Sequence, residues 1–226
     1  MKKLLIFGQN KEEIEKAAKD IGFEIVESEP EIIASFGGDG TFMMAEHTFP
    51  GVPKFPLRNS RICKLCFDMP NEEILKRIWA GEYKIEEEMK IEASANGEIV
   101  FGLNEIIVHN SDPRRAIRYT LSIGGKKITN EIIGDGVAIS TPIGSTGYYR
   151  SITDSFFQVG IGIAFNNSTE QSDHMVVKED SEILIKILRS PAMIYADNNP
   201  KEIILGDGDE VFVRKAKVAA KIIKLL

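Results

Sequence analysis

One aspartate stands among three glycines in the stretch SFGGDGTFM, residues 35–43, between an apolar run and a segment that predicts a helix. Backbone N–H groups at a helix N-terminus bind anions, and glycines tolerate positive φ and let a phosphate approach without an intervening Cβ. The stretch therefore predicts a phosphate-binding loop, although it lacks the lysine of a Walker A sequence. A plain strand-to-helix turn with Asp39 as a capping residue is the alternative. The residues assigned to phosphate are Gly37, Gly38, Gly40 and Thr41, with Thr41 either capping the helix or bonding a phosphate oxygen.

A second polar stretch, GDGVAISTPIGSTGYYRS at residues 134–151, contains a predicted strand over 137–140. Hydroxyl side chains donate hydrogen bonds to phosphate or ribose oxygens, and a tyrosine ring offers a face for a base. A loop so rich in small polar residues loses much conformational entropy when it is ordered, and binding residues concentrate on such loops. We therefore interpret this stretch as a ligand-binding loop.

A polar pair, Asn104 and Glu105, interrupts the apolar segment LNEIIVHN. An amide and a carboxylate together can pair with the donors of an adenine or with the hydroxyls of a sugar. From these residues alone, a polar pair on an edge strand is the better interpretation.

The elements that would position these residues change in rhythm along the chain. Short apolar runs before residue 37 predict strands, and they alternate with helical patterns. Asn10 is expected to cap the first helix through a capping box with Glu13, and Asn71 to cap another helix that ends at Gly81. Alternating strands and helices predict an α/β domain with a mostly parallel sheet over residues 1–84.

The remaining residues, 85–226, predict an all-β domain that is an antiparallel two-sheet sandwich, with the possibility that its C-terminal end packs back on the first domain. Short apolar runs are separated by turn sequences here. Asn96-Gly97, Gly124-Gly125 and the stretch Gly206–Gly208 are each expected to form a hairpin turn.

Composition restricts the class of protein. The net charge of −6 argues against a general nucleic-acid binder, and no apolar run approaches the length that crosses a membrane. The start MKKLLIFGQN reads as a first strand rather than a signal peptide, so the protein is expected in the cytoplasm. Basic clusters at 114–118 and 126–127 are expected to be solvated surface.

The only two cysteines, Cys63 and Cys66, form a C-x-x-C motif. Such a motif can be a redox pair or half of a zinc site. A zinc site needs about four ligands, and the three histidines are scattered without ligand spacing. Because RICKLCF also alternates like a strand, the expectation is two buried, reduced cysteines and no bound metal.

Taken in order, GGDGT, then Asn104-Glu105, then GDG-x4-TP-x-GST-x-Y resemble the NAD kinase family over nearly the full chain. The resemblance implies transfer of the γ-phosphoryl of ATP, with Mg²⁺ held mainly through the ATP phosphates, to the 2′-hydroxyl of the adenosine ribose of NAD. Asp39 would accept the hydroxyl proton as general base. It also implies a homo-oligomer, a dimer or tetramer, in which a neighbouring subunit completes the NAD pocket. The residues that the resemblance assigns to NAD are Asn104, Glu105, Asp135, Thr146, Gly147, Tyr148 and Ser151.

Two segments depart from the family pattern. Family members usually carry G-x-N-x-G-x-LGFL after GGDGT, and the corresponding stretch here is PLRNSRICKLCF, residues 56–67, without those glycines. A family strand ending in DGQ corresponds to ADNNP, which keeps Asp197. Another acceptor, such as a different nucleotide, a sugar or a lipid head group, is therefore the alternative to NAD. A non-catalytic dinucleotide sensor is a further alternative, which the presence of Asp39 disfavours.

Overall fold

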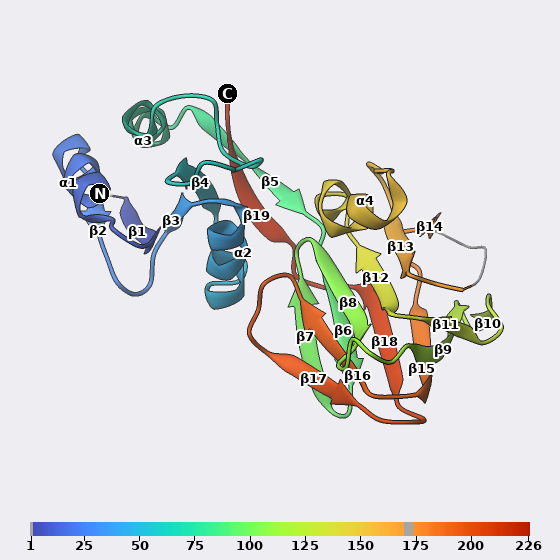
Figure 1. Ribbon diagram of the computed structural model, residues 1–226. Coiled ribbons are helices and arrows are strands. Elements are labelled where there is room, and N and C mark those ends of the chain that lie inside the picture. The colour runs from blue at the N-terminus through green and yellow to red at the C-terminus, as the bar shows by residue number, and fades with distance from the viewer. Residues whose placement is uncertain (1, 170–173) are drawn as a thin grey trace. The chain divides into compact units, whose positions relative to one another are not determined.

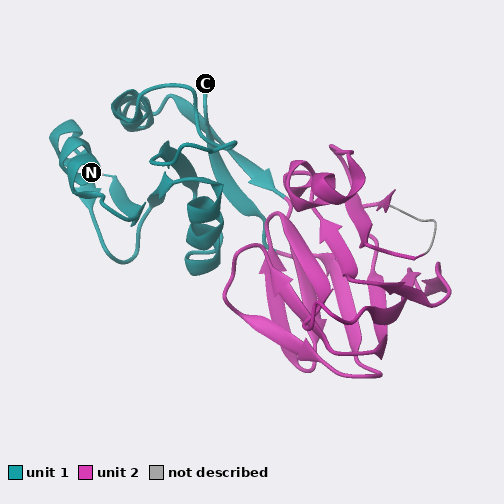
Figure 2. Cartoon of the chain, viewed as in Figure 1, with its two compact units in different colours: residues 1–88, 218–226 teal, residues 89–217 magenta. Residues whose placement is uncertain are grey.

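The computed structural model describes residues 2–169 and 174–226. The chain divides into two compact units, which we call unit 1 (residues 1–88 and 218–226) and unit 2 (residues 89–217), shown in teal and magenta in Figure 2. Unit 1 has one sheet, unit 2 has two, and each unit has its own core. We describe the two in turn.

Unit 1 is an α/β unit built on a six-stranded sheet of order β2-β1-β3-β4-β19-β5 (Figure 1). All neighbouring pairs are parallel except β19 with β5, so the expected mostly parallel sheet is confirmed. The strands are β1 (Lys3–Gly8), β2 (Glu24–Ile25), β3 (Ile32–Gly37), β4 (Lys54–Arg58), β5 (Tyr83–Glu88) and β19 (Ala220–Leu225), and the helices are α1 (Glu12–Ile21), α2 (Asp39–Thr48) and α3 (Asn71–Ala80).

The helices of unit 1 occur where the apolar periodicity predicts them, but the expected N-caps are wrong. The N-cap of α1 is Lys11 and that of α3 is Pro70, and neither makes a side-chain cap. Asn71 instead accepts a hydrogen bond from the N–H of Arg58 and donates one to its carbonyl oxygen, both at 2.9 Å. A tertiary partner therefore outcompeted the local cap. Gly81 ends α3 in the left-handed region at φ 80°, as expected.

Unit 2 is an antiparallel sandwich, which confirms the predicted fold class. One sheet has the order β10-β9-β15-β18-β6-β7 with β11 also paired to β9, and the other has the order β14-β13-β12-β8-β16-β17. Its strands are β6 (Ile91–Ala95), β7 (Glu98–Gly102), β8 (Glu105–Asn110), β9 (Ile117–Ile123), β10 (Lys126–Lys127), β11 (Ile132–Gly134), β12 (Gly136–Ser140), β13 (Ile161–Asn166), β14 (His174–Val177), β15 (Ile183–Arg189), β16 (Ala192–Ala196), β17 (Glu202–Leu205) and β18 (Glu210–Lys215); η1 (Gly144–Thr146) and α4 (Tyr148–Thr153) lie between β12 and β13.

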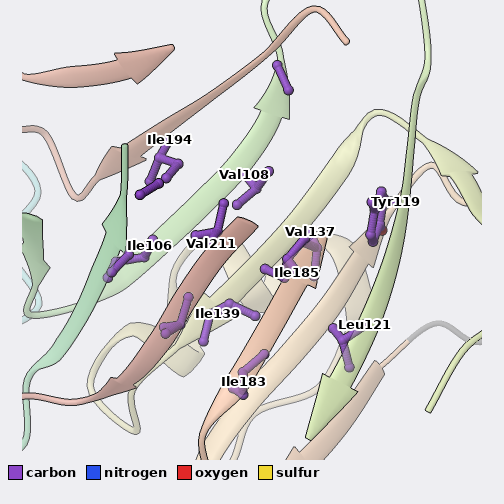
Figure 3. Packing of buried hydrophobic residues seen from close by; sticks show 14 of the residues in the cluster. Ile106, Val108, Tyr119, Leu121, Val137, Ile139, Ile183, Ile185, Ile194 and Val211 are labelled. Carbon is purple, nitrogen blue, oxygen red and sulfur yellow. The ribbon is translucent and has the colours of Figure 1, made fainter. Parts of the chain in front are cut away.

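The core of unit 2 lies between these two sheets (Figure 3). Alternate residues of each strand point inward, as the period of two requires. Ile185 and Val211 come from one sheet, and Val108, Ile139 and Ile194 from the other, and all five are fully buried. A continuous apolar core of this kind gives the polar loops at the strand ends a rigid support.

Two of the three expected hairpin turns are confirmed. Asn96 and Gly97 adopt positive φ (53° and 78°) between β6 and β7, and Gly124 and Gly125 do the same between β9 and β10. The turn over 206–208 joins β17 to β18, which belong to different sheets, so the hairpin expected there is wrong. Turn residues encode a chain reversal, but the strand that pairs with the next segment depends on tertiary packing.

The expected division after residue 84 falls inside β5. This strand pairs with β19 along its whole length, from Tyr83 with Leu225 to Glu88 with Ala220. The C-terminal strand therefore completes the sheet of unit 1. Among the described residues, no helix is long and apolar enough to cross a membrane.

Candidate active site

The glycine loop lies at the carboxyl end of β3, a central strand of the unit 1 sheet, where open α/β sheets bind ligands. Gly37 and Gly38 do not use the positive φ that glycine permits, and close approach is the reason for glycine here. A Cβ on Gly37 would lie 2.1 Å from Thr41 Oγ1, and one on Gly38 would lie 3.0 Å from the Ile62 carbonyl oxygen. The N-cap of α2 is Gly38, so Thr41 lies within the helix and is not its cap.

Asp39 is the first residue of α2, and its half-buried carboxylate is held by the segment that follows β4. Its Oδ2 accepts the N–H of Lys64 at 3.0 Å, and its Oδ1 accepts the N–H of Leu65 at 2.9 Å. A carboxylate has about four lone-pair sites, so each oxygen can still accept a second hydrogen bond. Asp39 is therefore oriented by the backbone and can still meet a substrate hydroxyl.

Cys63 and Cys66 form a disulfide bond, so the expectation of two reduced thiols is wrong. The predicted strand is also wrong, because residues 59–70 contain no regular strand or helix. The alternating pattern of RICKLCF has no neighbouring strand to pair with, and its amides turn instead toward Asp39. Cys63 Sγ lies 3.4 Å from Asp39 Oδ1.

In unit 2, Asn104 and Glu105 stand where the chain enters β8, and Asp197 fixes the backbone there. The Asp197 carboxylate accepts the N–H groups of Leu103, Asn104 and Glu105 at 2.7, 2.8 and 2.9 Å. Asp197 follows β16 and has a φ of 48°, a conformation that aspartate tolerates better than most residues. Asp197 therefore positions the polar pair.

The loop after β12 is fastened to the same backbone. The N–H of Thr141 donates to the Asn104 carbonyl oxygen at 2.8 Å, and the Thr141 hydroxyl donates to the Leu103 carbonyl oxygen at 2.6 Å. A Cβ on Gly144 would lie 2.1 Å from the Asn104 carbonyl oxygen, so only glycine permits this approach. Two of the three sequence signals are thus adjacent in the fold.

Glu105 has the electrostatic signature of a ligand-facing group. Burial, and secondly the charge of Asp197, raises the pKa of Glu105 to about 8. Its buried Oε2 has no hydrogen-bond partner among the described residues. A Cβ on Gly147 would lie 3.8 Å from this oxygen, which places the loop beside it. An unsatisfied buried polar atom of this kind fits a ligand that supplies the missing hydrogen bond.

Tyr148 is oriented by two residues that the sequence patterns did not single out. Asn166 Nδ2 donates to the Tyr148 hydroxyl at 3.1 Å and to His109 Nε2 at 3.2 Å. The His109 Nδ1–H donates to the Asn110 carbonyl oxygen at 3.0 Å, which fixes the tautomer that accepts at Nε2. Burial, followed by the charges of Asp135 and Glu105, raises the pKa of Tyr148, so the phenol stays neutral and can donate its proton.

The remaining predicted site residues of unit 2 serve different local roles. The Asp135 carboxylate accepts hydrogen bonds from Asn110 Nδ2 at 3.2 Å and Asn167 Nδ2 at 2.6 Å, so it holds these two side chains in place. Thr146 is exposed at the end of η1. The Ser151 hydroxyl donates to the Tyr148 carbonyl oxygen at 2.6 Å within α4.

Arg114 and Arg115 of the arginine cluster are exposed, as expected, whereas Arg118 is half-buried. Arg114 makes a two-point hydrogen bond with Asp112, and Arg118 pairs with Glu131 at 2.6 Å. The structure therefore brings together Asn104, Glu105, Gly147 and Tyr148 in unit 2, and places Asp39 with the glycine loop in unit 1.

Comparison with known proteins gives a consistent result. Residues 103–225 match the family model of the ATP-NAD kinase C-terminal domain. The NAD kinase of Saccharolobus solfataricus is 29% identical over 223 residues, covering 94% of this chain and 87% of the relative. The NAD kinase of Carboxydothermus hydrogenoformans is 31% identical over 212 residues, covering 86% of this chain and 74% of the relative.

Two solved structures share the fold over the whole chain. The yeast NADH kinase complexed with NADH superimposes with a TM-score of 0.86 at 17% identity, covering 100% of this chain and 84% of that one. An NAD kinase from Archaeoglobus fulgidus in complex with ATP superimposes with a TM-score of 0.81 at 22% identity, covering 100% and 94%.

Proposed function

The chain belongs to the ATP-NAD kinase family, and from that premise we propose that it phosphorylates the 2′-hydroxyl of the adenosine ribose of NAD with ATP, giving NADP and ADP. The observation that carries the mechanism is the orientation of Asp39 by two backbone N–H groups at the mouth of a glycine loop. The names of the relatives count against another acceptor and against a sensor without activity.

In the proposed reaction, Asp39 accepts the proton of the ribose hydroxyl as the ribose oxygen bonds to the γ-phosphorus. The bond from that phosphorus to the β,γ-bridging oxygen breaks, and ADP leaves. A ribose hydroxyl is a poor nucleophile until its proton departs, so a fixed acceptor lowers the barrier. The amides of Lys64 and Leu65 keep the carboxylate in one orientation during this transfer.

We assign the phosphates to the glycine loop and the start of α2. The loop residues are small enough for close approach, and the helix N-terminus favours negative charge. Mg²⁺ would offset the phosphate charge and would be held mainly by ATP. The residues that we assign to the phosphates are Gly37, Gly38, Gly40 and Thr41.

We assign the dinucleotide to unit 2. Glu105, uncharged because the pKa of its carboxyl is raised to about 8, can both donate to and accept from an adenine edge or a ribose hydroxyl. Tyr148 offers a phenolic donor and a ring face. Asn104, Thr146, Gly147 and Ser151 would line the pocket, and Asp135 would support it. We further propose that the protein acts in the cytoplasm as a homo-oligomer, a dimer or tetramer.

The direct test is the identity of the product. Purified protein is incubated with ATP, Mg²⁺ and NAD, and NADP is read with an NADP-specific dehydrogenase. We expect NADP only when all three are present. ATP consumption with a different nucleotide, a sugar or a lipid head group, and none with NAD, would contradict the proposal.

A further inference from the structure

The cysteine pair lies against the proposed base. Cys63 and Cys66 are joined by a disulfide, and the two residues that they enclose, Lys64 and Leu65, are the ones whose N–H groups donate to Asp39. Cys63 Sγ also lies 3.4 Å from Asp39 Oδ1. The short covalent ring therefore presents both amides to the carboxylate.

The position of the ring follows from the sheet. β3 and β4 are parallel neighbours, so the segment after Arg58 emerges beside the glycine loop after Gly37. The N–H of Asn59 donates to the Gly37 carbonyl oxygen at 3.1 Å and holds the two chain ends together. The segment from Ser60 to Met69 then has neither strand nor helix to fix it. Phe67 and Met69 pack against the core of unit 1. The residues before them are held by the disulfide and by the hydrogen bonds to Asp39.

We propose that Cys63 and Cys66 form a thiol–disulfide exchange site whose oxidation state sets the rate of the kinase through the orientation of Asp39. This inference rests on the proposed role of Asp39 as the base. The partner is a dithiol reductant in one direction and a disulfide oxidant in the other. The disulfide form is the faster enzyme, because it fixes Asp39 while leaving that side chain half-exposed.

The exchange balances as a two-electron step. A thiolate of the external dithiol attacks the Sγ of Cys66, the more exposed of the two residues. The Sγ–Sγ bond breaks, and Cys63 leaves with the electron pair. The second thiol of the reductant closes its own disulfide and releases Cys66. Two protons complete the two protein thiols. A thiolate at Cys63 would face the Asp39 carboxylate at 3.4 Å, so charge repulsion favours its protonation.

Reduction changes Asp39 in two ways. The backbone between the cysteines regains conformational freedom, so the amides of Lys64 and Leu65 no longer hold one position. The new Cys63 S–H becomes a donor toward Oδ1 and competes there with the ribose hydroxyl. Both changes lower kcat, and neither involves the residues assigned to NAD.

The test compares the two oxidation states of the same protein. Because the chain has two cysteines, thiol labelling and mass spectrometry report on this pair alone. The protein is oxidised with glutathione disulfide or reduced with dithiothreitol, and kcat and KM for NAD are measured in each form. We expect reduction to lower kcat about tenfold with little change in KM, and re-oxidation to restore it. Equal kcat values in forms that labelling shows to be fully oxidised and fully reduced would overturn the proposal.

The double variant Cys63→Ser/Cys66→Ser should be locked at the lower rate and insensitive to either reagent. A double variant with the kcat of the oxidised wild type would also overturn the proposal. If the variant does not fold, the reversible comparison on the wild-type chain still decides the matter.

Hydrogen exchange over residues 60–68 supplies a readout that is independent of activity. Protection in the oxidised form should be lost on reduction and also in oxidised Asp39→Ala, which lacks the acceptor. Protection that is unchanged by reduction would contradict the coupling. NADP from neither form would overturn the proposed function, whereas NADP made at one rate by both forms would overturn the switch alone.

Discussion

The carboxyl groups of Asp39 and Glu105 differ in the partners that their surroundings supply. Asp39 accepts two backbone N–H bonds, and they orient it. Glu105 Oε2 is buried without a partner among the described residues. The pKa of this carboxyl is raised to about 8, so the group is uncharged at lower pH. An oriented carboxylate suits proton acceptance, and a neutral carboxylic acid suits hydrogen bonding to a ligand.

Glu105 should give the ligand-free protein a pH-dependent stability. The pKa of its carboxyl rises from 4.5 to about 8 on folding, so the folded chain keeps a proton that the unfolded chain releases between these values. This contribution is fully present below the lower value and is lost as pH rises through the upper one. The free energy of unfolding of Glu105→Gln should therefore rise relative to that of the wild type by on the order of a few kcal/mol between about pH 5 and about pH 8.

Urea unfolding of both proteins across this pH range measures the difference. Glu12→Gln, a change at an exposed carboxyl on α1, serves as the matched control and should follow the wild type. A Glu105→Gln curve that runs parallel to the wild-type curve at every pH would show that Glu105 is not held protonated.

Asp197 should act on NAD binding through the backbone that it positions. Asp197→Asn replaces one acceptor oxygen with an NH₂ group, so at least one of the N–H groups of Leu103, Asn104 and Glu105 loses its partner. Losing a charge-assisted hydrogen bond costs about 1.5–3 kcal/mol, so the KM for NAD should rise about 10- to 100-fold. The KM for ATP should change little.

Steady-state kinetics with each substrate varied in turn checks this expectation. Asp20→Asn, at an exposed position of α1, is the matched control. Equal increases in both KM values would indicate general damage to the fold rather than a role at the dinucleotide site.

At the scale of elements, the sequence predicts those parts of the fold that local chemistry determines. The α/β-to-β change, the end of α3 at Gly81 and the hairpin at Asn96-Gly97 follow from apolar periodicity and turn residues. The cap expected at Asn71 is wrong because its side chain pairs with Arg58, a tertiary contact that is invisible in local patterns. The same reason explains the hairpin wrongly expected over 206–208. Asn10 lies outside α1 at a φ of 51°, and Lys11 takes the N-cap position.

The site was predictable to a similar extent. GGDGT and the 134–151 loop are recognisable because their residue types carry chemistry. His109 and Asn166 had no signal, since each lies in a strand whose pattern gives no information on a partner in space. The disulfide is not predictable from RICKLCF, because its alternating pattern favours a strand and only the fold shows its amides turned toward Asp39.

The loop after β12 offers a matched pair of glycine substitutions. Gly144→Ala would place a Cβ 2.1 Å from the backbone oxygen of Asn104, so the loop or β8 must shift. Gly147→Ala would place its Cβ no closer than 3.2 Å to any neighbouring atom. Gly144→Ala should therefore weaken NAD binding at least about tenfold and lower Tm, whereas Gly147→Ala should stay close to the wild type.

Calorimetric titration of NAD into each variant gives the comparison, with circular dichroism as the check on folding. Equal NAD affinities in Gly144→Ala and the wild type would contradict the tight packing of the loop on Asn104.

For the whole molecule, the path of the chain links the two units. The chain leaves unit 1 after β5, forms unit 2, and returns as β19 between β4 and β5. Ile222 and Ile223 of β19 are buried. Ending the chain at Lys217 should therefore expose the core of unit 1 and leave β5 without its partner strand.

The shortened chain is expected to be cleaved by protease within residues 1–88, while unit 2, whose strands are all retained, resists. Removal of Leu226 alone, which is exposed, is the control and should change little. Mass spectrometry of limited-proteolysis fragments locates the cuts. A residue 1–88 segment as resistant as in the full chain would show that β19 is dispensable.

The central claim is that Asp39 accepts the proton of the NAD ribose, and the most direct measurement is kcat for NADP formation by Asp39→Asn beside the Kd for NAD. The variant keeps the size of the side chain, removes its basicity, and retains an acceptor for one of the two N–H groups that orient it. We predict that kcat falls about 100-fold or more while Kd stays within about threefold of the wild type. A variant that folds, binds NAD and keeps the wild-type kcat would contradict the account.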